Sequence, residues 1–245
     1  MAAELCIRSG RIALKDGDRA FRLEIDDFAL GAGEAVALTG TSGAGKTLLL
    51  ELLGLLRAPG GGTVYLHRDG QGGETDLAAL WAQGPRNPDL ARLRGALFGF
   101  VPQTGGLLPF LTVAENIALP QRVNHRPDAA RCRALMARLG IADIAALRPG
   151  ALSIGQRQRA AIARALAHRP AFVIADEPTA ALDPETADAV LALLLETARA
   201  EGAGLILSSH DIPRMERFGI ARRALVPGRH GAGEAVSRLQ TVVPC

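Results

Sequence analysis

The chain has 245 residues, of which 48% are hydrophobic and 22% charged, so it can bury a sizeable core and is too apolar to be intrinsically disordered. Its formal net charge at pH 7 is only +3, with acidic and basic residues interspersed, so the charge pattern indicates no nucleic-acid partner. The three cysteines lack metal-binding spacing, no signal peptide is visible, and no apolar run is long enough to cross a bilayer, so we expect a soluble cytoplasmic protein.

The first part of the chain is predicted to begin with antiparallel strands. Residues 4–12 and 20–30 have strand character and are separated by "KDGD", which is typical of a turn. "EAVALTG" (34–40) is a short buried strand, and residues 46–57 are apolar on nearly all sides, as in a buried helix. Residues 70–89 are rich in Gly, Asp and Pro, so we predict mostly loop there.

The second part alternates between helices and strands. Residues 126–152 show helical spacing without a strand, and they predict a helical lobe inserted between strands. Residues 171–176 and 204–209 are buried strands on either side of a helix over 185–202. Strands that alternate with helices are typical of parallel βαβ units, so the chain is predicted to have an α/β fold with a mostly parallel core sheet.

The domain organisation follows from these elements. We predict a single domain over residues 1–228, with an antiparallel β part at its N-terminus and the inserted α-helical lobe at about 104–155. Residues 229–245 are predicted to be a C-terminal tail.

A phosphate-binding motif lies between the strand at 34–40 and the helix that follows it. "GTSGAGKT" has the P-loop spacing, in which small residues let successive backbone N–H groups turn toward one point at a helix N-terminus. Lys46 is expected to reach the β- and γ-phosphates and the Thr47 hydroxyl to ligate Mg²⁺. The predicted ATP-binding residues of this loop are Gly40, Thr41, Ser42, Gly43, Ala44, Gly45, Lys46 and Thr47.

Three polar residues at the ends of later strands suit the chemistry of phosphate cleavage. Asp176 and Glu177 end the strand in "FVIADEP", and two adjacent carboxylates there repel each other unless a cation lies nearby. We predict that Asp176 holds Mg²⁺ through water and that Glu177 acts on the attacking water. His210 closes the next strand in "SSHD", at the same edge of the sheet, where it is predicted to donate to the γ-phosphate.

Together the motifs resemble those of one family. "GTSGAGKT", "VPQ", "LSIGQRQR", "VIADEPTAALD" and "SSHD" occur in the order found in ATP-binding cassette (ABC) transporter ATPase subunits, and the resemblance covers roughly residues 5–228. "GFVPQTGGLLPFLTVAENIALP" is similar, more narrowly, to the lipoprotein-release and macrolide-export branch.

The resemblance implies that the ATP sites are shared between two subunits. Such ATPases form head-to-tail dimers in which the P-loop of one copy faces the Ser-x-Gly-Gln of the other. Ser153 and Gly155 would then face the γ-phosphate of the partner, with Gln156 nearby, and Asp183 would lie close to the facing P-loop. A helix N-terminus that presents free N–H groups suits this role.

The resemblance also implies a role for Gln103 and a membrane partner. Gln103 would contact Mg²⁺ or the attacking water and couple the nucleotide to the helical lobe, and residues around 104–135 would receive a transmembrane permease. ATP would close the dimer and hydrolysis would reopen it. We therefore expect a cytoplasmic ATPase held at the inner face of the membrane by a permease, with export or extraction of lipid-linked cargo as the favoured role.

Two departures from the family pattern keep alternatives open. Ile154 stands where the family usually has glycine, and no aromatic residue lies near residue 13, where one usually stacks on adenine; Phe21 is the nearest. An ATP-binding module with little turnover is therefore one alternative. A mechanical regulator of a membrane protein that moves no substrate is another, because the motifs do not distinguish the two roles.

Overall fold

The computed structural model describes residues 3–16, 19–230 and 234–241. The chain divides into two units, one formed by Met1–Ala91 with Ser208–Cys245 and the other by Arg92–Leu207. Among the described residues, none of the helices combines the length and the apolar character needed to span a bilayer.

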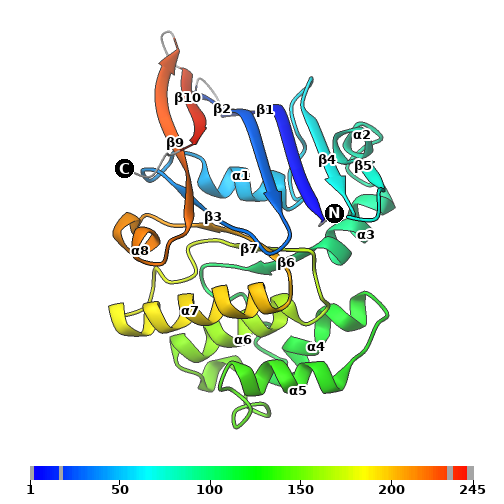
Figure 1. The fold of residues 1–245 in the computed structure, drawn as a ribbon, viewed down its shortest axis with the longest axis vertical. Coiled ribbons are helices and arrows are strands. Elements are labelled where there is room, and N and C mark those ends of the chain that lie inside the picture. Colours follow the sequence, from blue (N-terminus) through cyan, green and yellow to red (C-terminus); the bar gives the residue numbers. More distant parts are fainter. Residues whose placement is uncertain (1–2, 17–18, 231–233, 242–245) are drawn as a thin grey trace. The chain divides into compact units, whose positions relative to one another are not determined.

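The first unit is built on a sheet that begins with the predicted antiparallel pair (Figure 1). β1 (Glu4–Asp16) and β2 (Arg19–Gly31) pair along most of their length, with Ile7 opposite Phe28 and both side chains fully buried. The pairing passes over Ser9 and Asp26, so the alternation of buried and exposed residues is interrupted there. Residues 17 and 18 of the predicted turn lie outside the described residues.

The other strands of this unit extend the pair on both sides. β1 pairs antiparallel with β4 (Val64–Arg68), which pairs with β5 (Glu74–Asp76). On the far side of β2 the order continues through β10 (Glu234–Thr241) and β9 (Ala221–His230) to β3 (Ala35–Thr39). β9 runs parallel to β3, so the strand that leads into the P-loop has a parallel neighbour.

The helix after β3 is shorter than predicted. α1 (Lys46–Leu53) was expected to continue to residue 57, but it ends at Gly54. The hydroxyl of the fully buried Tyr65 on β4 donates to the Leu53 carbonyl over 2.6 Å, which satisfies one of the last carbonyls of the helix. Burial also raises the pKa of Tyr65, so this hydroxyl stays a donor. α8 (Ile212–Arg217) lies in the C-terminal part of this unit.

One prediction about this part of the chain was wrong. Residues 70–89 are not mostly loop, because they contain β5, α2 (Leu77–Ala82) and the beginning of α3 (Pro88–Leu97). The side chain of Asp76 accepts a hydrogen bond from the Ala79 N–H and so caps α2, and Leu77 is fully buried. α2 and α3 each bury one leucine, Leu77 and Leu90, and form despite the loop-like composition.

The predicted C-terminal tail also contains a strand. β10 runs parallel to β2 and antiparallel to β9, with Val236 and Leu239 buried. The segment Glu234–Thr241 therefore extends the sheet of this unit. Residues 231–233 and 242–245 lie outside the described residues.

The second unit has a parallel sheet and a group of helices. β6 (Phe98–Val101), β7 (Phe172–Ala175) and β8 (Gly204–Ser208) pair in parallel. Every residue of β7 and β8 is buried, as expected for strands covered on both faces. The strand and helix positions predicted for this region are confirmed.

The helices of this unit lie together in Figure 1. The segment from 104 to 155, predicted as the helical lobe, contains α4 (Val113–Val123), α5 (Ala129–Arg138) and a 3₁₀ turn (Pro149–Ala151). α6 (Ile154–Leu166) begins at the end of this segment. α7 (Pro184–Ala200) lies between β7 and β8 in the sequence.

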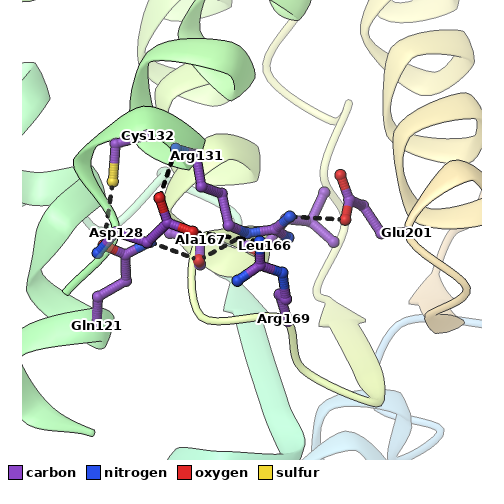
Figure 2. A network of polar contacts seen from close by, with 8 residues as sticks. All are labelled: Gln121, Asp128, Arg131, Cys132, Leu166, Ala167, Arg169 and Glu201. Carbon is purple, nitrogen blue, oxygen red and sulfur yellow. Dashed lines mark hydrogen bonds and ion pairs between the residues drawn. The ribbon is translucent and has the colours of Figure 1, made fainter. Parts of the chain in front are cut away.

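One arginine connects three of these helices through hydrogen bonds (Figure 2). Arg131 of α5 donates to the carbonyls of Leu166 and Ala167, at the C-terminal end of α6, over 2.6 and 2.9 Å. Its Nη1 atom also bonds to Glu201, just past α7, over 2.8 Å. Gln121 of α4 donates to the Ala167 carbonyl as well. A cation at a helix C-terminus also interacts favourably with the helix dipole, so this network holds the end of α6.

Replacement of Arg131 by methionine is expected to lower the free energy of unfolding by about 2–3 kcal/mol, because two carbonyls and the Glu201 carboxylate lose a charged partner. Arg169→Ala is the control, since its side chain is 65% exposed and its ion pair with Asp128 contributes little. Urea titration followed by circular dichroism measures both. Equal losses for the two variants would contradict the role given to Arg131.

Candidate functional site

The P-loop connects β3 to α1 through glycines with left-handed backbone. Gly43 and Gly45 have φ of 78° and 94°, which favours glycine strongly. A Cβ on Gly40 would lie 2.7 Å from the Leu225 carbonyl oxygen on β9, so a larger residue would displace the loop from the sheet. The backbone geometry alone therefore favours glycine at positions 40, 43 and 45.

The start of α1 is suited to binding an anion. Gly45 is its N-cap, and glycine has no side chain that would compete with an anion at the helix start. The Lys46 ammonium, on a side chain that is mostly buried, donates to the carbonyls of Gly40 and Thr41 over 3.0 and 3.4 Å. Its positive charge is thus held against the loop, while Thr41, Ser42, Gly43 and Thr47 are exposed.

An aromatic ring lies directly against this loop. The Phe21 ring on β2 comes within 3.0 Å of the position a Cβ on Gly45 would occupy, and its side chain is partly exposed. On the neighbouring strand the register places Leu14 opposite Phe21, and Ala13 is small and exposed. β2 therefore brings the aromatic residue to the P-loop, and β1 does not.

His210 lies in the same unit as the P-loop. The N–H of the preceding residue, Ser209, donates to the Leu38 carbonyl on β3 over 3.0 Å, so this segment of the first unit lies beside β3. His210 is exposed, and the next residue, Asp211, caps α8 by accepting the Arg214 N–H. His210 therefore lies close to the end of β3, the strand that leads into the P-loop.

The second unit brings Gln103, Asp176 and Glu177 to one edge of its sheet. The Asp176 N–H donates to the Val101 carbonyl at the end of β6 over 3.0 Å, and Gln103 follows Val101 by two residues. β6 and β7 run parallel, so their carboxyl ends deliver these residues to the same side. Asp176 and Glu177 are both partly exposed after a fully buried strand.

The backbone at Glu177 is strained. Its φ is 44°, in the left-handed region that non-glycine residues rarely adopt. The following turn is closed by a hydrogen bond from the Ala180 N–H to the Glu177 carbonyl over 3.1 Å. Strain of this kind is held where the surrounding structure requires a particular side-chain direction.

The start of α6 is closed by a reciprocal cap. Ser153 accepts a hydrogen bond from the Gln156 N–H over 3.2 Å, and the Gln156 side chain accepts one from the Ser153 N–H over 2.9 Å. This capping box fixes both side chains at the helix N-terminus. Ile154, the residue that departs from the family pattern, is 48% exposed and so does not belong to the core.

Asp183 begins α7 close to the start of α6. Its carboxylate accepts the Thr186 N–H over 3.0 Å, which lowers the pKa of Asp183 and keeps the group charged. A Cβ on Gly155 would lie 3.0 Å from the Thr186 methyl group, so glycine permits the two helix starts to approach closely. The structure thus gathers Ser153, Gly155 and Asp183 in one region.

The predicted site residues therefore form separate groups. The P-loop and His210 belong to the first unit, and the other predicted residues belong to the second. Among the described residues, no group of three or more His, Cys, Asp or Glu side chains is arranged to hold a metal. Thr47, Gln103 and Asp176 offer hydroxyl, amide and carboxylate oxygens, which is the donor chemistry that Mg²⁺ prefers.

Sequence reasoning missed two features of these sites. The first is the position of the Phe21 ring, which would have required the register of β1 and β2. The second is Arg164 of α6, which donates to the carbonyls of Gly105 and Gly106 in the loop after Gln103. The glycine pair in "QTGG" was a visible signal, but the arginine that binds it is distant in the sequence.

Comparison of the sequence with known proteins identifies its relatives. A family model described as ABC transporter matches residues 23–180. The Rhodospirillum rubrum lipoprotein-releasing system ATP-binding protein LolD 1 is 41% identical over 206 residues, which cover 82% of this chain and 86% of that protein. LolD of Anaeromyxobacter dehalogenans is 44% identical over 193 residues, covering 77% of this chain and 76% of that one.

Two solved structures have the same fold. The dimeric structure of MJ0796, a bacterial ABC transporter cassette, has a TM-score of 0.74 at 28% identity and covers 90% of this chain and 93% of that one. The post-hydrolysis state of MJ0796 bound to ADP and Pi has a TM-score of 0.77 at 28% identity, with 98% and 100% covered. The predicted α/β P-loop fold is thereby confirmed.

The strain at Glu177 predicts an unusual effect on stability. Glu177→Gly is expected to raise the free energy of unfolding by about 1 kcal/mol, because glycine adopts the left-handed region without steric cost. Glu185→Gly, in the first turn of α7, is the control and is expected to lower it by about 1 kcal/mol. Urea unfolding measures both, and Glu177→Gln reports the effect of charge alone. A loss at position 177 as large as that at 185 would rule out backbone strain there.

Proposed function

This chain belongs to the ABC transporter family, and we propose that it is the ATPase subunit of a lipoprotein-releasing system, in which it drives a separate membrane permease. It is an ATP-binding and ATP-hydrolysing cassette that works as a dimer, like the MJ0796 cassettes it resembles. The lipoprotein cargo is supported by the names of its relatives, several of which are LolD proteins at 37–44% identity.

The observation that carries the proposal is the P-loop geometry. Left-handed glycines, an uncapped helix start and a lysine held against the loop together make a site for the phosphates of ATP. In this proposal Lys46 and the first turn of α1 stabilise the negative charge that develops during cleavage of the γ-phosphate.

The remaining catalytic groups are assigned by their motifs. Glu177 orients the attacking water and accepts its proton, and His210 donates a hydrogen bond to the γ-phosphate. Thr47, Gln103 and Asp176 are the residues that would hold Mg²⁺, which neutralises phosphate charge when bound. The strained backbone at Glu177 supports its assignment, because strain is retained where a side chain must point in one direction.

The partner copy would contribute the other half of each ATP site. Ser153, Gly155 and Gln156 at the start of α6 would face the partner's γ-phosphate, with Asp183 near the facing P-loop. The N-terminus of α6 carries a partial positive charge that suits a phosphate, although the Gln156 N–H is already bound by the Ser153 side chain. Ile154 is exposed at this end, where the facing copy would cover it.

The permease would bind the helical lobe. Phe110 and Val123 are 67% and 64% exposed, which is unusual for large apolar side chains, and both fall within residues 104–135. We place the protein at the inner face of the membrane, held there by the permease. The domain boundaries of the sequence analysis, residues 1–228 with a lobe at about 104–155, remain part of this proposal.

ATPase activity and dimerisation of three variants test the proposed function. Lys46→Ala and Glu177→Gln are each expected to reduce phosphate release at least about 100-fold, because charge stabilisation and proton transfer are lost. Glu177→Gln should also accumulate an ATP-bound dimer, detected by light scattering with Mg-ATP, and adding Ser153→Arg should prevent it. Monomers throughout, together with phosphate release that is insensitive to Lys46→Ala, would refute the scheme.

Phe21 is expected to contribute to binding of the adenine base, since its ring lies at the P-loop and stacking is worth about 1–3 kcal/mol per base. Phe21→Leu should raise the dissociation constant for ATP about tenfold or more and leave that for inorganic triphosphate unchanged, whereas Phe21→Tyr should keep ATP affinity. Equilibrium dialysis measures both ligands. Equal weakening of ATP and triphosphate would show that the ring only supports the loop.

A further inference from the structure

The positive charge of the chain is concentrated in one segment. Residues 104–170, from the loop after β6 to just past α6, contain ten arginines and three acidic residues, a formal net charge of +7. The rest of the chain contains 18 basic and 22 acidic residues, a formal net charge of −4. A segment with this imbalance attracts anionic surfaces, and its exposed arginines determine where the attraction acts.

The turn that joins α4 to α5 is held in place by two amide side chains. The Asn124 side chain donates to one carbonyl of α3 and one of α4, each over 2.8 Å. The Gln121 side chain, which is buried, donates to the Ala167 carbonyl over 2.8 Å and accepts the Asp128 N–H over 2.8 Å (Figure 2). The inner side of the turn is therefore fixed to three helices of the same unit.

The outer side of the same turn carries basic side chains around an apolar one. Arg122, Val123, His125 and Arg126 are all exposed, and so is Arg133 in the middle of α5. Burial raises the pKa of the Cys132 thiol, and the charges of Arg122 and Arg133 both oppose this rise, so the two arginines lie near the same point. We call these five exposed residues, 122, 123, 125, 126 and 133, the α4–α5 patch.

The acidic side chains near the patch are engaged elsewhere. Glu115 accepts hydrogen bonds from the Thr112 N–H and hydroxyl over 2.8 and 2.9 Å, which lower its pKa more than the charge of Arg122 does. Asp128 caps α5 and pairs with Arg169 over 3.2 Å. Among the described residues, no carboxylate forms an ion pair with an arginine of the patch. The positive charge of the patch is therefore free to act on an external anion.

Arginines around an exposed apolar side chain suit the surface of an anionic bilayer. Guanidinium groups bind the headgroup phosphates, and Val123, which is 64% exposed, can enter the boundary of the acyl chains. A nucleic acid offers the same charge but no apolar layer for Val123. Phe110 lies before the other end of α4, an 11-residue helix about 16 Å long, so a permease held at Phe110 does not have to cover the patch.

We propose that the α4–α5 patch binds the anionic headgroups of the bilayer directly, as a contact with the membrane that does not require the permease. The inference rests on the proposed function, which places the chain at the inner face of the membrane. It adds to that function a lipid-binding surface, which keeps the subunit close to its permease between cycles of ATP hydrolysis.

Flotation with vesicles tests whether the chain binds lipid without permease or nucleotide. The full-length chain should float with vesicles that contain phosphatidylglycerol and stay behind with vesicles of phosphatidylcholine alone. Raising the salt concentration to about 0.5 M should abolish the binding, because the Debye length then becomes shorter than the contact. Failure to float with either kind of vesicle, or equal flotation with both, would overturn the proposal.

Two charge-matched triple variants show whether the patch is the site of binding. Each replaces three exposed arginines by glutamine, and thermal melting confirms that each is folded. The patch variant is Arg122→Gln, Arg126→Gln and Arg133→Gln, and the control is Arg8→Gln, Arg11→Gln and Arg86→Gln. The patch variant should bind phosphatidylglycerol vesicles about 100-fold more weakly, about fivefold for each arginine, and the control less than about threefold more weakly. Equal weakening would overturn the proposal, since binding would then follow net charge alone.

A single variant distinguishes a bilayer from a soluble polyanion. Val123→Ser should weaken vesicle binding about threefold and leave heparin binding unchanged, because only a bilayer offers the side chain an apolar layer. Tighter binding to duplex DNA than to the vesicles at the same salt concentration would overturn the proposal. Displacement of the vesicles by glycerol phosphate would also overturn it, since it would indicate a discrete phosphate site. Failure of the proposed function is seen separately and without vesicles, as phosphate release in the parent chain that Lys46→Ala does not reduce.

Discussion

The constraint on which the site depends is how each helix N-terminus satisfies its free N–H groups. α1 begins at a left-handed glycine, which has no side chain to cap it, so its start suits an anion. α6 and α7 begin instead at Ser153 and Asp183, whose side chains accept N–H groups of their own helices. The same physical element thus lies at the proposed phosphate site in one unit and is capped by a side chain in the other.

Rigidity of α6 follows from contacts at three points along it. The capping box closes its start, Arg164 binds the carbonyls of Gly105 and Gly106, and Arg131 binds its last carbonyls, as Figure 2 shows for Arg131. Most of these contacts satisfy backbone groups, and Arg131 also bonds to the Glu201 side chain. The start, the side and the end of the helix are therefore each held by hydrogen bonds.

The sequence predicted the parts of the site that lie in short motifs, because those motifs encode local backbone geometry. Lys46 and Glu177 were assigned their roles this way, and the structure places them at the start of α1 and after β7, as the sequence predicts; most strands of the parallel sheet were also predicted. The parts that it missed depend on pairing between distant segments. β10 joins β2 across most of the chain length, and Arg164 binds carbonyls, which leave no mark on residue identity. The role proposed for Phe21 depends on the position of its ring, which lies 3.0 Å from where a Cβ on Gly45 would be and which the sequence does not show.

The cap at Ser153 and its proposed contact with a phosphate are compatible rather than exclusive. A hydroxyl group can accept one hydrogen bond while it donates another, so Ser153 can keep the Gln156 N–H and still offer its proton to a phosphate oxygen. The start of α6 therefore does not have to unfold when the partner's nucleotide arrives, and no local folding energy is lost on closure. In the proposed dimer, closure then depends on where the capped start of α6 lies relative to the partner's nucleotide.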